Sequence, residues 1–123
     1  MKILIAEDDR DLSRLAETIL RASGHVVIKA VDASQILPSA QREKPDLILL
    51  DINMPGGKGS DILVKLKRSS LTSNIQVIVV SSETNPQLHE FVVKEGAEGF
   101  LQKPWMPENF VQELKKLSPN LPW

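Results

Sequence analysis

Residues 46–59 read DLILLDINMPGGKG, and the rest of the chain can be arranged around this stretch. Four consecutive apolar residues, Leu47 to Leu50, lie between two aspartates. Such a short apolar run is typical of a strand that is buried on both faces of a sheet. The proline and three glycines after Asp51 favour a loop and do not allow the strand to continue. We therefore expect Asp51 at the carboxyl end of a central strand, the edge where open α/β sheets bind ligands.

The composition is that of an ordinary globular domain, because 41% of the 123 residues are hydrophobic and 25% are charged. A net charge of -1, without a block of Lys or Arg, gives no electrostatic reason to expect nucleic acid or membrane binding. The absence of Cys excludes disulfides and cysteine-based zinc sites. The two histidines, His25 and His89, are expected on the surface. No run reaches the length of a membrane span, so we expect a cytoplasmic protein.

Strands and helices are predicted to alternate five times along the chain. Short apolar runs predict strands at residues 3–6, 26–28, 46–51, 77–80 and 99–102. Apolar residues at helical spacing predict helices that begin near Leu12, Ala33, Asp61, Pro86 and Pro107. This alternation indicates a parallel sheet with helices on both faces.

Local features refine this pattern. Pro38 falls inside the second predicted helix, which we expect it to shorten or kink. Asp9 is expected to cap the first helix in preference to binding a metal ion. Trp105 is expected to anchor the last helix by packing. Residues 118–123 contain two prolines, so we expect either a loose C-terminal tail or the start of a linker.

Charged and hydroxyl-bearing residues stand at the ends of four predicted strands: Glu7 and Asp8, then Asp51, Ser81 and Lys103. In a parallel sheet these ends lie along one edge, where three carboxylates repel one another and raise each other's pKa. A divalent cation relieves that repulsion, and oxygen ligands favour Mg²⁺. A carboxylate nucleophile, a hard cation, a lysine and a hydroxyl group together indicate phosphoryl transfer, because cations and donors stabilise the charge on the transferred group.

The chain resembles the CheY-like receiver domains of two-component response regulators, and we assign residues 1–117 to such a domain. The resemblance implies a flavodoxin-like, doubly wound α/β fold of five parallel strands in the order 2-1-3-4-5, with five helices on two faces. The motifs that carry it are Glu7-Asp8, Asp51-Ile52-Asn53-Met54-Pro55 with Gly59, Ser81, and Lys103-Pro104, the last of which implies a cis peptide bond.

The resemblance also implies the roles of the residues at the predicted site. Asp51 is the expected phosphoacceptor for a phosphoryl group from a phosphohistidine. The expected Mg²⁺ ligands are the side chains of Asp8 and Asp51, the backbone carbonyl of Asn53, and Glu7 through metal-bound water. Ser81 and Lys103 are expected to bind phosphoryl oxygens.

Further positions are expected to govern the response to phosphorylation. By resemblance, Ser81 moves toward the phosphoryl group and the aromatic Phe100 turns inward, which is a two-state element biased by a ligand. Asn53 and Glu83 occupy the positions that tune the access of water to the acyl phosphate, and hence its lifetime.

The implied function is a signalling switch in a phosphorelay that catalyses only its own phosphorylation and dephosphorylation. Its expected partners are a sensor histidine kinase or a histidine phosphotransfer protein, and a downstream protein on the face of the fourth helix, fifth strand and fifth helix. Direct contact with nucleic acid and membrane insertion are not expected. A homodimer that forms on phosphorylation is left open.

Three alternatives remain at this point. A receiver fragment of a hybrid histidine kinase or multidomain regulator would carry the same motifs. A passive interaction module would use the fold without phosphorylation. An aspartate-nucleophile phosphatase would need a second aspartate two residues after Asp51, and Asn53 at that position argues against it.

Overall fold

The computed structural model describes residues 1–123 and contains one five-stranded parallel sheet in the order β2-β1-β3-β4-β5. The strands are β1 (Lys2–Ala6), β2 (Val26–Ala30), β3 (Leu47–Asp51), β4 (Gln76–Ser81) and β5 (Gly99–Gln102). The helices are α1 (Arg10–Ala22), α2 (Ala33–Glu43), α3 (Gly59–Arg68), α4 (Pro86–Lys94) and α5 (Phe110–Leu117), the last preceded by a 3₁₀ turn, η1 (Pro107–Asn109). The predicted fold class and strand order are confirmed.

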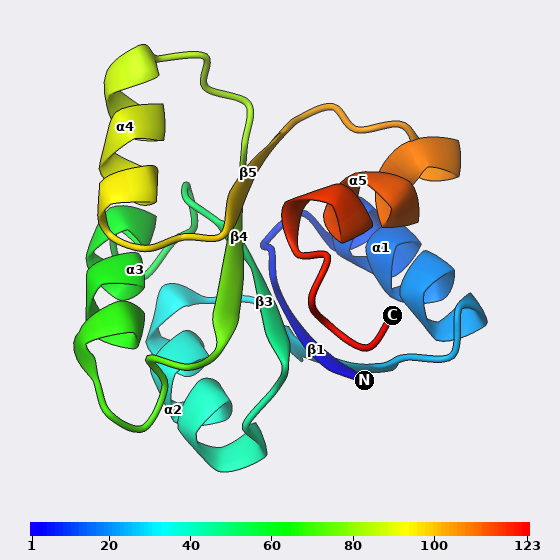
Figure 1. Ribbon diagram of the computed structural model, residues 1–123, viewed down its shortest axis with the longest axis horizontal. Coiled ribbons are helices and arrows are strands. Elements are labelled where there is room, and N and C mark those ends of the chain that lie inside the picture. The colour runs from blue at the N-terminus through cyan, green and yellow to red at the C-terminus, as the bar shows by residue number, and fades with distance from the viewer.

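The helices cover the two faces of the sheet, with α1 and α5 on one side and α2, α3 and α4 on the other (Figure 1). Two apolar cores result, one under each layer. Strand β3 contributes residues to both cores, because Leu47 and Leu49 face the α1 and α5 side while Ile48 and Leu50 face the other side. Its continuous apolar run therefore reflects burial on both faces, as predicted. None of the helices is long and apolar enough to cross a membrane.

The helices begin where the sequence places caps. The carboxylate of Asp9 accepts hydrogen bonds from the backbone N–H groups of Asp11 and Leu12, at 3.0 and 3.1 Å, and so caps α1 as expected. Asn85 caps α4 by accepting from the Gln87 N–H, directly before Pro86 at the first helical position. These caps set where each chain segment leaves the carboxyl edge of the sheet.

Pro38 does not shorten helix α2, which continues past it to Glu43, so this part of the expectation was wrong. A kink at Pro38 stays a prediction. Proline lacks the N–H that would bond the carbonyl of the preceding helical turn. Pro38 lies on the exposed side of the helix, as does Ser34 one turn earlier, so water can satisfy the freed carbonyl.

The C-terminal residues also differ from expectation. Leu121 and Trp123 pack against the core under α1 and α5 instead of forming a loose tail, and the Trp123 indole N–H donates to the Ser118 carbonyl at 2.7 Å. The Trp123 ring meets the His25 ring edge-on, with centroids 5.6 Å apart. His25, expected on the surface, is only 6% exposed because this segment lies over it. The division at residues 117 and 118 stays a prediction.

His25 is expected to contribute a fall in the free energy of unfolding as the pH drops below 6.5, the ordinary pKa of histidine. Glu7, whose pKa burial raises to about 7, contributes a slope of the opposite sign over part of this range, so the His25 contribution is isolated by substitution. Burial lowers the pKa of His25, and the charges of the Met1 amino group and Lys115 lower it further. The Met1 amino group also donates to His25 Nδ1 at 3.1 Å, which requires an unprotonated acceptor. The unfolded chain therefore binds the proton more readily, and stability is lost from pH 6.5 down to the lowered pKa.

Urea unfolding followed across this pH range will check the prediction. His25→Gln keeps a neutral acceptor, and the stability of the wild type relative to this variant is expected to decrease as the pH falls below 6.5. His89→Gln, at an exposed position, should show no such change relative to the wild type. If the free energy of unfolding depends on pH in the same way in the wild type and in His25→Gln, the protonation of His25 does not affect stability in this range.

Candidate functional site

The predicted site residues meet at the carboxyl edge of the sheet. Glu7 and Asp8 follow β1, Asp51 ends β3, Ser81 ends β4, and Lys103 follows β5. These four strands are neighbours in the sheet, and all are parallel, so their last residues lie side by side. Residues separated by almost the whole chain are brought together by topology alone.

Three carboxylates form the acidic part of the site. Glu7, Asp8 and Asp51 can each present an oxygen so that the three oxygens lie within 4.8 Å of one another. Glu7 and Asp51 are buried, whereas Asp8 is exposed. A cluster of this kind offers only hard oxygen ligands and excess negative charge, and it therefore fits a hard divalent cation such as Mg²⁺.

Lys103 supplies the positive charge. Its Nζ lies 2.7 Å from Glu7 Oε1 and 3.2 Å from Asp51 Oδ2. Burial acts to lower the pKa of Lys103, but its hydrogen bond with Glu7 and the charges of both carboxylates outweigh burial and raise that pKa above its ordinary value. The ammonium therefore stays charged beside Asp51. The Lys103–Pro104 peptide bond is cis, as the resemblance implied.

Glu7 shows that the charges of the cluster are not balanced. Burial raises the pKa of Glu7 to about 7, and the neighbouring Asp51 carboxylate also raises it, against the lowering effect of Lys103. One ammonium faces two buried carboxylates, so part of the negative charge has no partner. A divalent cation bound at the cluster would relieve this imbalance.

The loops after β3 and β4 are joined above the site. The Asn53 backbone N–H donates to Asp51 Oδ1 at 3.0 Å, and its side-chain amide donates to Glu83 Oε1 at 3.1 Å. The Glu83 backbone N–H in turn donates to Ser81 Oγ at 3.0 Å. The sequence predicted both Asn53 and Glu83 as site residues but held no signal for the bond between them, because nothing local pairs residues thirty positions apart.

Phe100 lies outside the carboxylate cluster. It is half-buried on β5, packs against the core under α2, α3 and α4, and its ring lies 5.2 Å from that of exposed His89 on α4. Its ring therefore borders the surface between α4 and β5.

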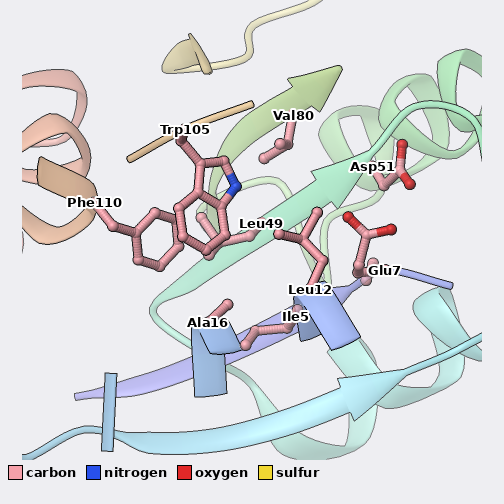
Figure 2. A pocket seen from close by; sticks show the side chains of 10 residues that line it. Ile5, Glu7, Leu12, Ala16, Leu49, Asp51, Val80, Trp105 and Phe110 are labelled. Carbon is pink, nitrogen blue, oxygen red and sulfur yellow. The ribbon is translucent and has the colours of Figure 1, made fainter. Parts of the chain in front are cut away.

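Trp105 lies closer to the site than the sequence indicated. Its indole stacks on Phe110, with ring centroids 3.9 Å apart, which confirms the expected packing against the last helix. It also lines a cavity of about 20 Å³ that has Glu7 and Asp51 in its wall (Figure 2). Sequence reasoning gave Trp105 a packing role and missed this proximity to the carboxylates.

A doubly wound sheet with three carboxylates and one lysine at its carboxyl edge defines a class of domain, and comparison places the chain within it. Residues 3–115 match the model of the response regulator receiver domain, and the chain belongs to this family. Receiver domains are signalling switches of two-component response regulators, which act with kinases and downstream effectors. The fold and site are consistent with phosphorylation-dependent signalling.

Individual relatives agree with this assignment. The chain is 33% identical over 116 residues to the transcriptional regulatory protein PrrA of Mycobacterium tuberculosis, covering 94% of the chain and 49% of PrrA. It is 29% identical over 114 residues to the phosphate regulon transcriptional regulatory protein PhoB of Escherichia coli, covering 93% of the chain and 50% of PhoB. It thus spans about half the length of these relatives. The chemotaxis response regulator CheY4 of Vibrio cholerae superposes with a TM-score of 0.87 at 27% identity, covering 94% of this chain and 97% of CheY4.

Proposed function

We propose that this domain is a phosphorylation switch in which Asp51 accepts a phosphoryl group from a phosphohistidine. The observation that carries the proposal is the position of the buried Asp51 carboxylate, 3.2 Å from a charged lysine and within reach of two more carboxylates. In the transfer, a carboxylate oxygen of Asp51 forms a bond to phosphorus while the phosphorus–nitrogen bond of the donor breaks. The imidazole leaves with that electron pair, and Asp51 becomes an acyl phosphate.

The surrounding residues have roles that follow from their contacts. Lys103 stabilises the negative charge that spreads over the phosphoryl oxygens. The Ser81 hydroxyl, whose oxygen accepts from the Glu83 N–H, would donate its hydrogen to one of those oxygens. Mg²⁺ held by Glu7, Asp8 and Asp51, with the Asn53 carbonyl, would supply further charge neutralisation when bound.

The Asn53–Glu83 bridge supports a second part of the proposal, which concerns the lifetime of the phosphorylated form. Both side chains are exposed and are joined over the loops that flank Asp51. Water that hydrolyses the acyl phosphate must approach past them. We therefore assign these two residues to the control of dephosphorylation.

The partners are proposed from the same geometry. A sensor kinase or histidine phosphotransfer protein must bring its phosphohistidine to the open carboxyl edge, where Asp8 is exposed. A downstream protein would bind the face of α4, β5 and α5, where Phe100 and His89 border a hollow. Turnover of other substrates forms no part of this proposal, because the Asn53 amide cannot act as the acid and base of an aspartate-nucleophile phosphatase. A cytoplasmic location stays a prediction.

Incubation of the wild-type protein with acetyl phosphate and Mg²⁺ is expected to add one phosphoryl group, because the acceptor, the lysine and the cation ligands are already assembled. Intact mass measures the addition, and fragmentation after borohydride reduction maps it to a residue. Chelation of Mg²⁺ with EDTA is expected to remove most of the adduct. A protein that remains unmodified, or that is modified equally in EDTA, would contradict the proposal and favour the passive interaction module.

A further inference from the structure

The backbone of the loop that carries Lys103 donates few hydrogen bonds. Strand β5 ends at Gln102, and the Lys103 N–H donates to the Ser81 carbonyl at 2.8 Å. No further backbone hydrogen bond is donated until Asn109 bonds to Met106. The lysine side chain is long and flexible, so the position of its ammonium depends on how firmly this loop is anchored.

Trp105 is the anchor of this loop. It lies two residues after Lys103, and its indole stacks on the Phe110 ring at 3.9 Å with an angle of 24° between the planes. Phe110 is only 1% exposed at the start of α5, so it is a fixed support. The loop is thus attached to the sheet through the Lys103 backbone N–H and to the core through the Trp105 side chain.

The cavity beside Trp105 connects this anchor to the site. Trp105 and Phe110 lie toward one end, and the carboxylates of Glu7 and Asp51 lie at the other (Figure 2). The wall between them is apolar and is completed by Ile5, Ala6, Leu12, Ala16, Leu49 and Val80. The space is about 20 Å³, so loss of the indole would open a much larger void directly behind the carboxylates.

We propose that Trp105 is a positioning residue for phosphoryl transfer: its stack on Phe110 holds the loop so that the Lys103 ammonium lies between Glu7 and Asp51. The inference rests on the proposed function, because the reaction in question is the phosphorylation of Asp51. It assigns Trp105 no contact with the phosphoryl group. Without the stack, the loop relaxes toward the void and the ammonium no longer meets both carboxylates.

Phosphorylation rates from acetyl phosphate at saturating Mg²⁺, followed by intact mass, test the proposal. Trp105→Ala is expected to slow the reaction at least about tenfold, since displacement by an ångström of a charge-stabilising group costs one to two orders of magnitude. Trp105→Phe keeps an aromatic stack and is expected to retain most of the rate. Trp123→Ala removes the other indole from the same core, far from the site, and is expected to leave the rate unchanged.

The double variant separates positioning from general damage. If Trp105 acts through Lys103, then Trp105→Ala causes no further loss in a Lys103→Ala background. A tenfold loss that persists in that background, or an equal loss in Trp123→Ala, would overturn the proposal.

Thermal unfolding tests the positioning role of Trp105 without any phosphoryl transfer. Its outcome therefore does not depend on whether the proposed function is correct. Lys103→Ala leaves the two buried carboxylates of Glu7 and Asp51 without a cationic partner and is expected to lower the midpoint of thermal unfolding. That loss should be smaller in the Trp105→Ala background, where the ammonium is already displaced. If the wild type takes up no phosphoryl group, the proposed function fails, and this comparison alone decides whether Trp105 positions Lys103. If Lys103→Ala lowers the unfolding midpoint equally in the wild-type and Trp105→Ala backgrounds, Trp105 does not position Lys103.

Discussion

Asp51→Asn is expected to abolish the phosphoryl adduct completely. The carboxamide has nearly the shape of the carboxylate, but it carries no charge and its oxygen is too weak a nucleophile to attack phosphorus. It also removes one of the three carboxylates that fit Mg²⁺. Intact mass after incubation with acetyl phosphate and Mg²⁺ should show the unmodified variant alone.

The same substitution is expected to leave the fold intact, which makes the loss interpretable. In the wild type, burial raises the pKa of Glu7 and the Asp51 carboxylate raises it further, so the two carboxylates are in unfavourable proximity. Removing one charge leaves Lys103 with a single carboxylate partner. We expect the Asp51→Asn protein, without Mg²⁺, to melt at the wild-type temperature or above it. Asp61→Asn, at an exposed position on helix α3, serves as the matched control and should still be phosphorylated. An adduct on the Asp51→Asn protein would place the acceptor elsewhere.

Gly59→Ala is expected to destabilise the protein by about 1–3 kcal/mol or more, the range for overpacking a close contact. Gly59 is buried at the start of α3, and a Cβ there would overlap the backbone carbonyl and Cα of Ile52. Ile52 directly follows Asp51, and its carbonyl accepts the Gly59 N–H at 3.1 Å. Backbone atoms cannot rotate away as a side chain can, so the loop or the helix must shift.

Urea unfolding measures this cost. Lys58→Ala, at the preceding position, is the control, because Lys58 is exposed and makes no capping bond. Its effect should stay within about 0.5 kcal/mol, as for surface positions generally. A Gly59→Ala protein that unfolds at the wild-type urea concentration would show that the loop after β3 yields easily.

Sequence reasoning reached the fold and the residues at the carboxyl edge because both depend on local patterns. The apolar run before Asp51 reports burial on both faces, and parallel topology then gathers the strand ends without further information. The strand order came from the family resemblance. The contacts that the sequence did not reveal join residues far apart in the chain.

His25 illustrates the limit. No pattern around it predicts burial, because the cover comes from Trp123 at the other end of the chain. The two prolines of residues 118–123 indicate irregular backbone, and they carry no information on whether an irregular segment packs. The Asn53–Glu83 bond and the approach of Trp105 to the carboxylates were missed for the same reason, since each depends on where a loop lies in space.

The two ends of the chain lie together (Figure 1). The Met1 amino group and the Trp123 ring both contact His25. They meet near the amino end of β1, whereas Asp51 stands at the opposite end of the parallel β3. A five-residue strand spans roughly 15 Å, so the two chain ends and the acceptor lie at opposite edges of the sheet. A conformational change caused by phosphorylation of Asp51 would therefore reach a protein fused at either chain end only through the sheet and its helices.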